Sequence, residues 1–140
     1  MDGSATTQSG VCRVIRSVDR YEGKQGPTYA GGVSAESVGA QGMWLGMVTM
    51  GPGTRTKAHF HDAHETAFYV ISGEIDLWFG QDLREHEVAR PGDYLYIPAG
   101  VSHVAVNHSQ TEPVVVVGGR TDPSEQESVV LQPELDALVP

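Results

Sequence analysis

Residues 92–107 read GDYLYIPAGVSHVAVN, and the turn inside this stretch decides the prediction of the fold. Pro98 and Gly100 set the geometry of a turn that separates two short segments with strand-like composition. After the turn the side chains alternate, so that His103 and Asn107 share one face of a predicted strand and the valines between them share the other. The stretch is therefore predicted to form two short strands joined by a tight turn.

The segments on either side of this stretch have the same character. Short runs rich in β-branched and aromatic residues alternate with glycine and proline turns, as in MWLGMVTM (43–50), TAFYVIS (66–72), EIDLWF (74–79) and PVVVV (113–117). This spacing, with no convincing central helix, favours an all-β sandwich or barrel in one domain. We expect a disordered tail over residues 1–10, a barrel over 11–131 that starts with a strand at VCRVIR (11–16), and a short helix or tail over 132–140.

A cluster of histidines lies upstream, in the stretch HFHDAHE at residues 59–65. His59 and His61 are two positions apart, so a strand would point both imidazoles to the same face. Two imidazoles side by side on a fixed backbone suit a metal ion, and Glu65 can add a carboxylate. Taken alone, the cluster also fits a polar hairpin that faces solvent. It further resembles the H-x-H-x-D-H of metallo-hydrolases, but its aspartate comes one position early and the chain is short for that fold.

The two stretches together resemble the signatures of the cupin family. The second signature, G-x5-P-x-G-x2-H-x3-N, is matched at Gly92, Pro98, Gly100, His103 and Asn107. The first, G-x5-H-x-H-x3,4-E-x6-G, is recognisable at Gly53, His59, His61, Glu65 and Gly73. The resemblance implies a single-domain cupin barrel, that is, a jelly-roll-like double-stranded β-helix. It also implies a metal site inside the barrel that is formed by His59, His61, Glu65 and His103.

The first signature departs from the family pattern at its carboxylate. Seven residues separate Glu65 from Gly73, where the pattern has six, and counting back from Gly73 puts Thr66 at the carboxylate position. Three alternatives stay open. Glu65 reaches the metal through a bulge, His64 takes its place, or three histidines and water complete the site.

Composition narrows the classes of partner. The formal net charge is -9 and no lysine or arginine cluster occurs, so neither nucleic acid nor a membrane surface is an expected partner. The first ten residues lack the features of a signal peptide, and no apolar run approaches the length of a membrane span. The one cysteine, Cys12, excludes an internal disulfide and is predicted to be a small core residue. We expect a cytoplasmic protein.

The resemblance implies one divalent transition metal ion and a small-molecule substrate or ligand. Iron(II) is the favoured ion, with zinc, manganese and nickel as alternatives. We expect a metal-dependent oxygenase, for example a dioxygenase. The alternatives are a non-redox isomerase, lyase or cyclase, and a protein that binds its ligand without turnover. No catalytic residue can be named, and the candidate pocket residues are Trp44, Tyr69, Trp78, Tyr94, Tyr96 and Arg120.

A homodimer is expected through the apolar strand at residues 11–15. His86 and His108 are expected at the surface.

Overall fold

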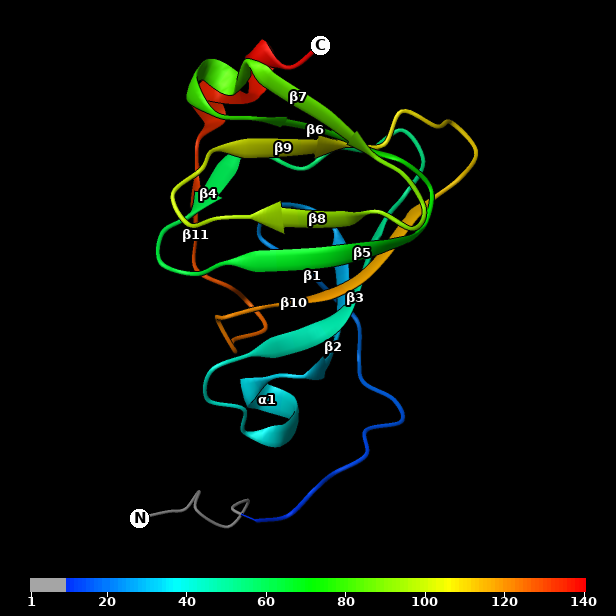
Figure 1. Ribbon diagram of the computed structural model, residues 1–140, viewed down its shortest axis with the longest axis vertical. Coiled ribbons are helices and arrows are strands. Elements are labelled where there is room, and N and C mark those ends of the chain that lie inside the picture. The colour runs from blue at the N-terminus through cyan, green and yellow to red at the C-terminus, as the bar shows by residue number, and fades with distance from the viewer. Residues whose placement is uncertain (1–9) are drawn as a thin grey trace.

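Two antiparallel sheets face each other in the computed structural model, which describes residues 10–140 (Figure 1). The six-stranded sheet has the order β1 (Tyr21–Glu22), β2 (Thr28–Val33), β3 (Trp44–Met50), β10 (Val114–Arg120), β5 (Thr66–Ser72) and β8 (Tyr94–Ile97). The five-stranded sheet has the order β11 (Val129–Leu131), β4 (His59–His61), β9 (His103–Val106), β6 (Ile75–Phe79) and β7 (Glu85–Ala89). The short helices are α1 (Ala35–Val38) and the 3-10 turns Gln81–Leu83 and Pro133–Leu138. The predicted all-β class and jelly-roll-like barrel are confirmed.

The core lies between the two sheets because the inward residues of each strand are large and apolar. On β3, Trp44 and Val48 are buried while Leu45 between them is exposed, as the period of two requires. On β10, Val114 and Val116 are buried in the same way. The outward valines of that strand are only half-buried, so the run PVVVV serves an inner and an outer face.

The register of the five-stranded sheet brings the two histidine stretches together. His59 on β4 pairs directly with His103 on β9, although His59 belongs to the first signature stretch and His103 to the second. The turn at Gly100 is held against the end of β4, because its backbone N–H donates to the carbonyl of His61 at 2.7 Å. Gly100 has φ = 82°, a left-handed conformation that glycine adopts without strain. The other edge of β4 pairs with β11, where Val129 lies opposite His61.

The segment before β1 differs from its prediction. Residues 11–16 form no strand, and Val11 and Val14 are 61% and 74% exposed. Cys12 is exposed as well, so the prediction that it is a core residue is wrong. An apolar stretch becomes a strand only where a neighbouring strand accepts its hydrogen bonds, and none in the described chain does so here. The predicted homodimer through this segment stays a prediction, and the predicted disordered tail lies outside the described residues apart from Gly10.

At the other end of the chain, the predicted short helix is a 3-10 turn, Pro133–Leu138. Figure 1 shows this segment beside the 3-10 turn that follows β6. Within residues 10–140, no helix combines the length and the apolar character that crossing a bilayer would need.

Asn107, the last residue of the second signature stretch, joins three segments of chain. Its side chain is 2% exposed, and Nδ2 donates to the carbonyls of Met50, Gly51 and Glu112 at 3.3, 3.1 and 2.9 Å. Its Oδ1 accepts from the backbone N–H of Ser109 at 3.1 Å. A single amide thus ties the end of β3 to the connection between β9 and β10.

We expect Asn107→Ala to lower the free energy of unfolding by about 2–4 kcal/mol, because it leaves carbonyl groups without donors in a buried place. Urea unfolding followed by circular dichroism measures the change. Gln110→Ala, at an exposed position of the same connection, is the control and should change the free energy by less than about 0.5 kcal/mol. Equal effects of the two substitutions would contradict the role given to the Asn107 amide.

Candidate metal centre

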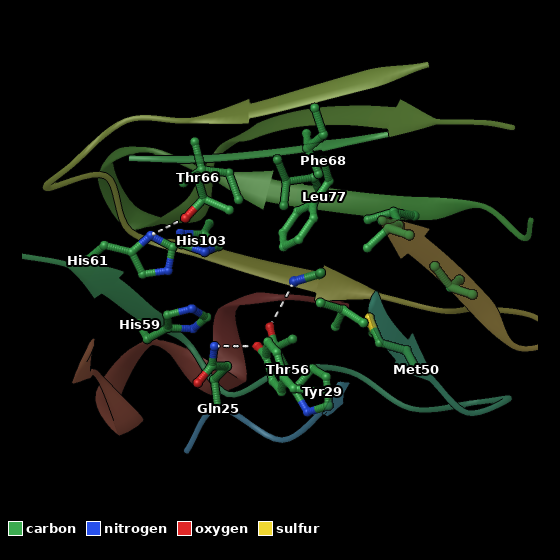
Figure 2. A pocket seen from close by; sticks show the side chains of 18 of the residues that line it. Gln25, Tyr29, Met50, Thr56, His59, His61, Thr66, Phe68, Leu77 and His103 are labelled. Carbon is green, nitrogen blue, oxygen red and sulfur yellow. Dashed lines mark hydrogen bonds between the residues drawn. The ribbon is translucent and has the colours of Figure 1, made fainter. Parts of the chain in front are cut away.

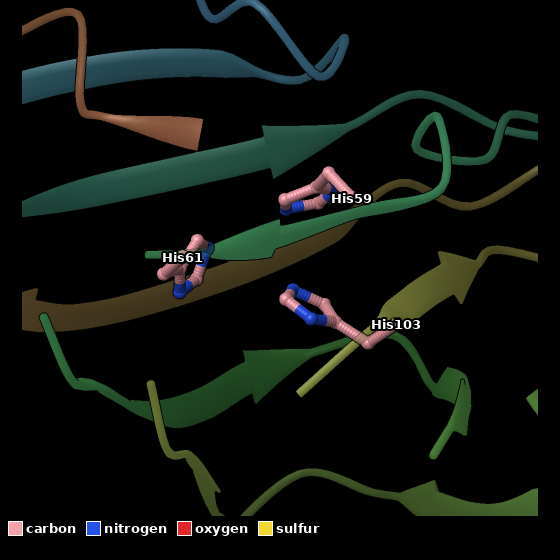
Figure 3. Close-up of side chains that lie close together, drawn as sticks. All are labelled: His59, His61 and His103. Carbon is pink, nitrogen blue, oxygen red and sulfur yellow. The ribbon is translucent and has the colours of Figure 1, made fainter. Parts of the chain in front are cut away.

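Three buried histidines meet on the inner side of the five-stranded sheet. His59 and His61 come from β4 and His103 from β9, and one ring nitrogen of each lies within 4.8 Å of the others (Figure 3). Their side chains are buried, with relative exposures of 2–4%. The i, i+2 spacing places the first two on one face, and the direct pairing of His59 with His103 brings in the third.

Hydrogen bonds fix which ring nitrogen is free in His59 and His103. Nδ1–H of His59 donates to the carbonyl of Lys57 at 2.7 Å, and Nδ1–H of His103 donates to the carbonyl of Val101 at 2.9 Å. Because a carbonyl only accepts, both rings carry their proton on Nδ1 and present the lone pair of Nε2. Nδ1 of His61 lies 3.3 Å from the hydroxyl of Thr66, which can accept the same kind of bond.

Burial keeps these imidazoles neutral. Removal from water lowers the pKa of His61 to about 4 and that of His103 to about 3, and it lowers the pKa of His59 as well. Neighbouring imidazoles act in the same direction at His61 and His103. The neutral imidazole is the form that binds metal ions, so the cluster is ready to act as a ligand set at pH 7.

Glu65 lies outside this cluster. Its side chain is exposed, and its Oε1 accepts a hydrogen bond from the hydroxyl of Tyr96 at 2.7 Å. The reason is the alternation of β5, which begins at Thr66: the buried Thr66 points inward beside His61, so the residue before it points outward. The structure therefore brings together His59, His61 and His103, but it does not bring Glu65 to them.

A different carboxylate reaches the histidines from the far end of the chain. Glu127 precedes β11, is 6% exposed, and has its Oε1 3.5 Å from Nε2 of His61. The same oxygen accepts from Nε2 of His64 at 2.7 Å, while its other oxygen accepts from the Gln25 amide at 2.9 Å and lies 3.4 Å from Nη1 of Arg120. One ligand atom each of His61, His64 and Glu127 forms a second group within 4.8 Å.

Glu127 is held in its charged form. Burial by itself raises the pKa of this carboxyl, but the hydrogen bond from His64 and the charge of Arg120 outweigh it and lower the pKa to about 2. Sequence reasoning missed this residue because it stands in an ordinary polar segment, SEQESVV, with no spacing that relates it to the histidines. Only the pairing of β11 with β4 places it.

The histidines line one end of an internal cavity. Figure 2 shows His59, His61, His103, Gln25 and Thr66 toward one end, and Met50 near the other. The cavity has a volume of about 60 Å³. Its remaining wall is largely hydrocarbon and includes Val48, Met50, Phe68, Ile75, Leu77, Leu95, Val114 and Val116. A neighbouring hollow of about 240 Å³ shares Leu77, Leu95, Ile97 and His103 with it.

The donor set fits a divalent transition metal ion. Three neutral imidazoles converge from two adjacent strands, the partner of each Nδ1 fixes its ring, and the cavity leaves room on the open side of the cluster. A space of this size accommodates an ion with a few small ligands.

Comparison with known proteins agrees with the fold and with the histidine pattern. The sequence model of the cupin domain matches residues 46–118, just over half of the chain. The chain belongs to the cupin family. The resemblance of its two motifs to the cupin signatures is thus confirmed, and the matched region of this cupin contains His59, His61 and His103.

One relative and two solved structures illustrate the similarity. Quercetin 2,3-dioxygenase of Bacillus subtilis (strain 168) is 30% identical over 73 residues, which are 51% of this cupin and only 20% of the dioxygenase. The structure of a Klebsiella pneumoniae protein with a double-stranded β-helix domain has a TM-score of 0.62 at 20% identity, covering 88% of this chain and 96% of that one. Oxalate decarboxylase of Bacillus subtilis has a TM-score of 0.64 at 21% identity, covering 81% of this chain and 29% of that one. The two structures bear on the fold alone.

The aromatic residues and the arginine that were candidates for the pocket differ in burial. Among the aromatic residues, Tyr69, Tyr94 and Tyr96 are 39%, 84% and 60% exposed, whereas Trp44 is buried in the core of this cupin. None of these four side chains lines the cavity of the histidines. Arg120 is buried beside Glu127.

The two histidines that were expected at the surface are exposed. Nε2 of His108 lies 2.5 Å from one carboxylate oxygen of Asp76, and Nε2 of His86 contacts the other. The ring of His86 also stacks on Trp78, with 4.3 Å between the ring centroids. Neither histidine belongs to the groups of three or more ligating side chains found in residues 10–140.

Proposed function

We propose that this cupin is a metal-dependent oxygenase that acts on a small, largely apolar organic molecule, with iron(II) as the favoured ion. The supporting observation is the division of the cavity, which has three imidazole nitrogens at one end and hydrocarbon side chains at the other. When bound, a redox-active ion supplies Lewis acidity and a place where dioxygen and substrate can react.

The residues of the chain then have separate tasks. The three imidazoles would hold the ion, and they lie at one end of the cavity that would receive the substrate. Lys57 and Val101 orient His59 and His103 through their carbonyls. The apolar wall excludes water and favours a substrate that offers one polar group to the ion and hydrocarbon to the remainder of the cavity.

The volume of the cavity bears on the size of the substrate. Pockets that enclose drug-sized ligands measure roughly 300–1,000 Å³, and the cavity of this cupin is about 60 Å³. The curated relative is named for a reaction of quercetin, a molecule in that larger class. We therefore propose small phenols and enols as substrates, ahead of a flavonol. A sugar is a poorer candidate, because its hydroxyl groups would lack partners along the apolar wall.

An oxygen electrode tests the proposal. The protein is loaded with iron(II) without oxygen, mixed with a panel of small phenols and enols and with quercetin, and then supplied with dioxygen. We expect oxygen uptake in proportion to substrate loss for at least one small compound. His61→Ala with the same total iron is the control for oxidation by free iron, and it should show none of this substrate-dependent uptake.

Two outcomes would overturn the assignment. Conversion of substrate without oxygen uptake, with zinc, manganese or nickel as effective as iron, would identify a non-redox enzyme. Saturable binding without any product after long incubation would identify a protein that carries or senses its ligand.

A further inference from the structure

We propose that Glu127 supplies the carboxylate of the metal centre, in the place where the cupin signature has an acidic residue and this chain has Thr66. The inference rests on the metal centre of the proposed function and adds its acidic group. The carboxylate of Glu127 belongs to the segment before β11 and lies next to the ring of His61.

The position of the carboxylate carries the first part of the argument. Oε1 of Glu127 lies 3.5 Å from Nε2 of His61, which is the ring nitrogen left free when Nδ1 faces Thr66. Two atoms that each bind one ion at roughly 2.1 Å can be separated by such a distance. Glu127 is also the one acidic side chain among the described residues that line the cavity. Glu65, by contrast, is exposed and bonded to Tyr96.

Charge is the second part of the argument. Three neutral imidazoles leave the two positive charges of a divalent ion uncompensated in a buried site, which is unfavourable in a medium of low dielectric. Arg120 adds a further positive charge to the same buried region, with Nη1 3.4 Å from Oε2 of Glu127. A carboxylate beside the ion offsets part of the positive charge, and Glu127 is the buried carboxylate that contacts His61 of the cluster.

Hydrogen bonds from neighbouring side chains hold the Glu127 carboxylate in a fixed orientation. His64 donates to Oε1 and Gln25 donates to Oε2, so each oxygen accepts a hydrogen bond from a side chain. Nδ1 of His64 faces a carboxylate oxygen of Asp122 at 3.8 Å, so this ring lies between two acidic groups. His64, one of the alternatives for the missing ligand, is in this arrangement a positioning residue for Glu127.

Metal affinity and the spectrum of bound cobalt test the assignment. Glu127→Gln keeps the shape of the side chain and removes its charge, and Glu65→Gln makes the same change at the exposed position. Cobalt(II) and zinc(II) affinities are measured by competition with a chelator, together with the visible absorption of the cobalt(II) form. We expect Glu127→Gln to weaken binding about 10–100-fold and to change the cobalt spectrum, and Glu65→Gln to change neither.

Three results would decide against the inference or against its basis. If Glu65→Gln weakens binding and Glu127→Gln does not, the carboxylate is Glu65. If His61→Ala abolishes metal binding but Glu127→Gln equals the unmodified protein, the metal centre stands and the role of Glu127 falls. If His61→Ala binds metal as the unmodified protein does, the metal centre itself falls.

A crystal structure of the unmodified, cobalt-loaded protein gives an answer even if Glu127→Gln does not fold. The inference expects Glu127 to be the carboxylate nearest the ion. A nearer carboxylate from Glu65 would overturn it.

Discussion

We expect His61→Ala and His103→Ala each to bind a divalent metal ion at least about 100-fold more weakly than the unmodified protein does. Each substitution leaves two imidazoles of the three that converge at the cavity. The barrel should stay folded in both variants, since its core is formed by apolar side chains of both sheets rather than by the histidines. Elemental analysis after dialysis against a trace of metal measures the content, and far-UV circular dichroism follows the fold.

His108→Ala is the matched control, because it removes an imidazole that is exposed and paired with Asp76. It should retain the metal content of the unmodified protein. A full equivalent of metal in His61→Ala, or a loss in His108→Ala equal to that in His103→Ala, would mean that the ion binds elsewhere.

Arg120→Met is expected to lower the free energy of unfolding of the metal-free protein by about 3–5 kcal/mol. Arg120 is 4% exposed, donates to the carbonyls of Ser124 and Glu125 at 2.6 and 2.9 Å, and has its guanidinium 4.2 Å from the ring centre of Trp44. Methionine fills much of the same volume, but it leaves Glu127 without its nearest cation and two carbonyls without donors. The cost of a buried unpaired charge is large, and it dominates the change.

Urea unfolding in the presence of a chelator measures this loss. Arg90→Met is the control, since Arg90 and Glu74 form an ion pair at 3.6 Å in which both side chains are more than half exposed. Exposed pairs of this kind contribute little, so the control should change the free energy by less than about 1 kcal/mol. A similar small effect of Arg120→Met would show that the buried charges are not coupled.

Much of the fold could be predicted from local pattern. The turn at Gly100, the alternation after His103 and the two-residue spacing of His59 and His61 are properties of short stretches, and the structure has each of them. The strand expected at residues 11–16 is absent because its apolar pattern needs a neighbouring strand, which local pattern cannot reveal.

The carboxylate of the candidate site shows even more clearly that local pattern cannot predict contacts between distant segments. The spacing to Gly73 already pointed to Thr66, and the inward position of Thr66 at the start of β5 agrees with that count. Nothing in the spacing pointed to Glu127, because its place depends on which strand pairs with the outer edge of β4. Pairing between distant strands is decided by tertiary packing, and a single sequence carries no local signal for it.

The direct pairing of His59 with His103 also constrains the order of events when the chain folds. The two strands are far apart in the sequence, so their histidines meet only after a long loop has closed and the five-stranded sheet has formed. An ion that needs all three imidazoles therefore finds no site on the unfolded chain or in a single hairpin, and it cannot nucleate the barrel. Such an ion would bind to the finished barrel, and we expect it to stabilise the protein mainly by slowing unfolding rather than by speeding folding.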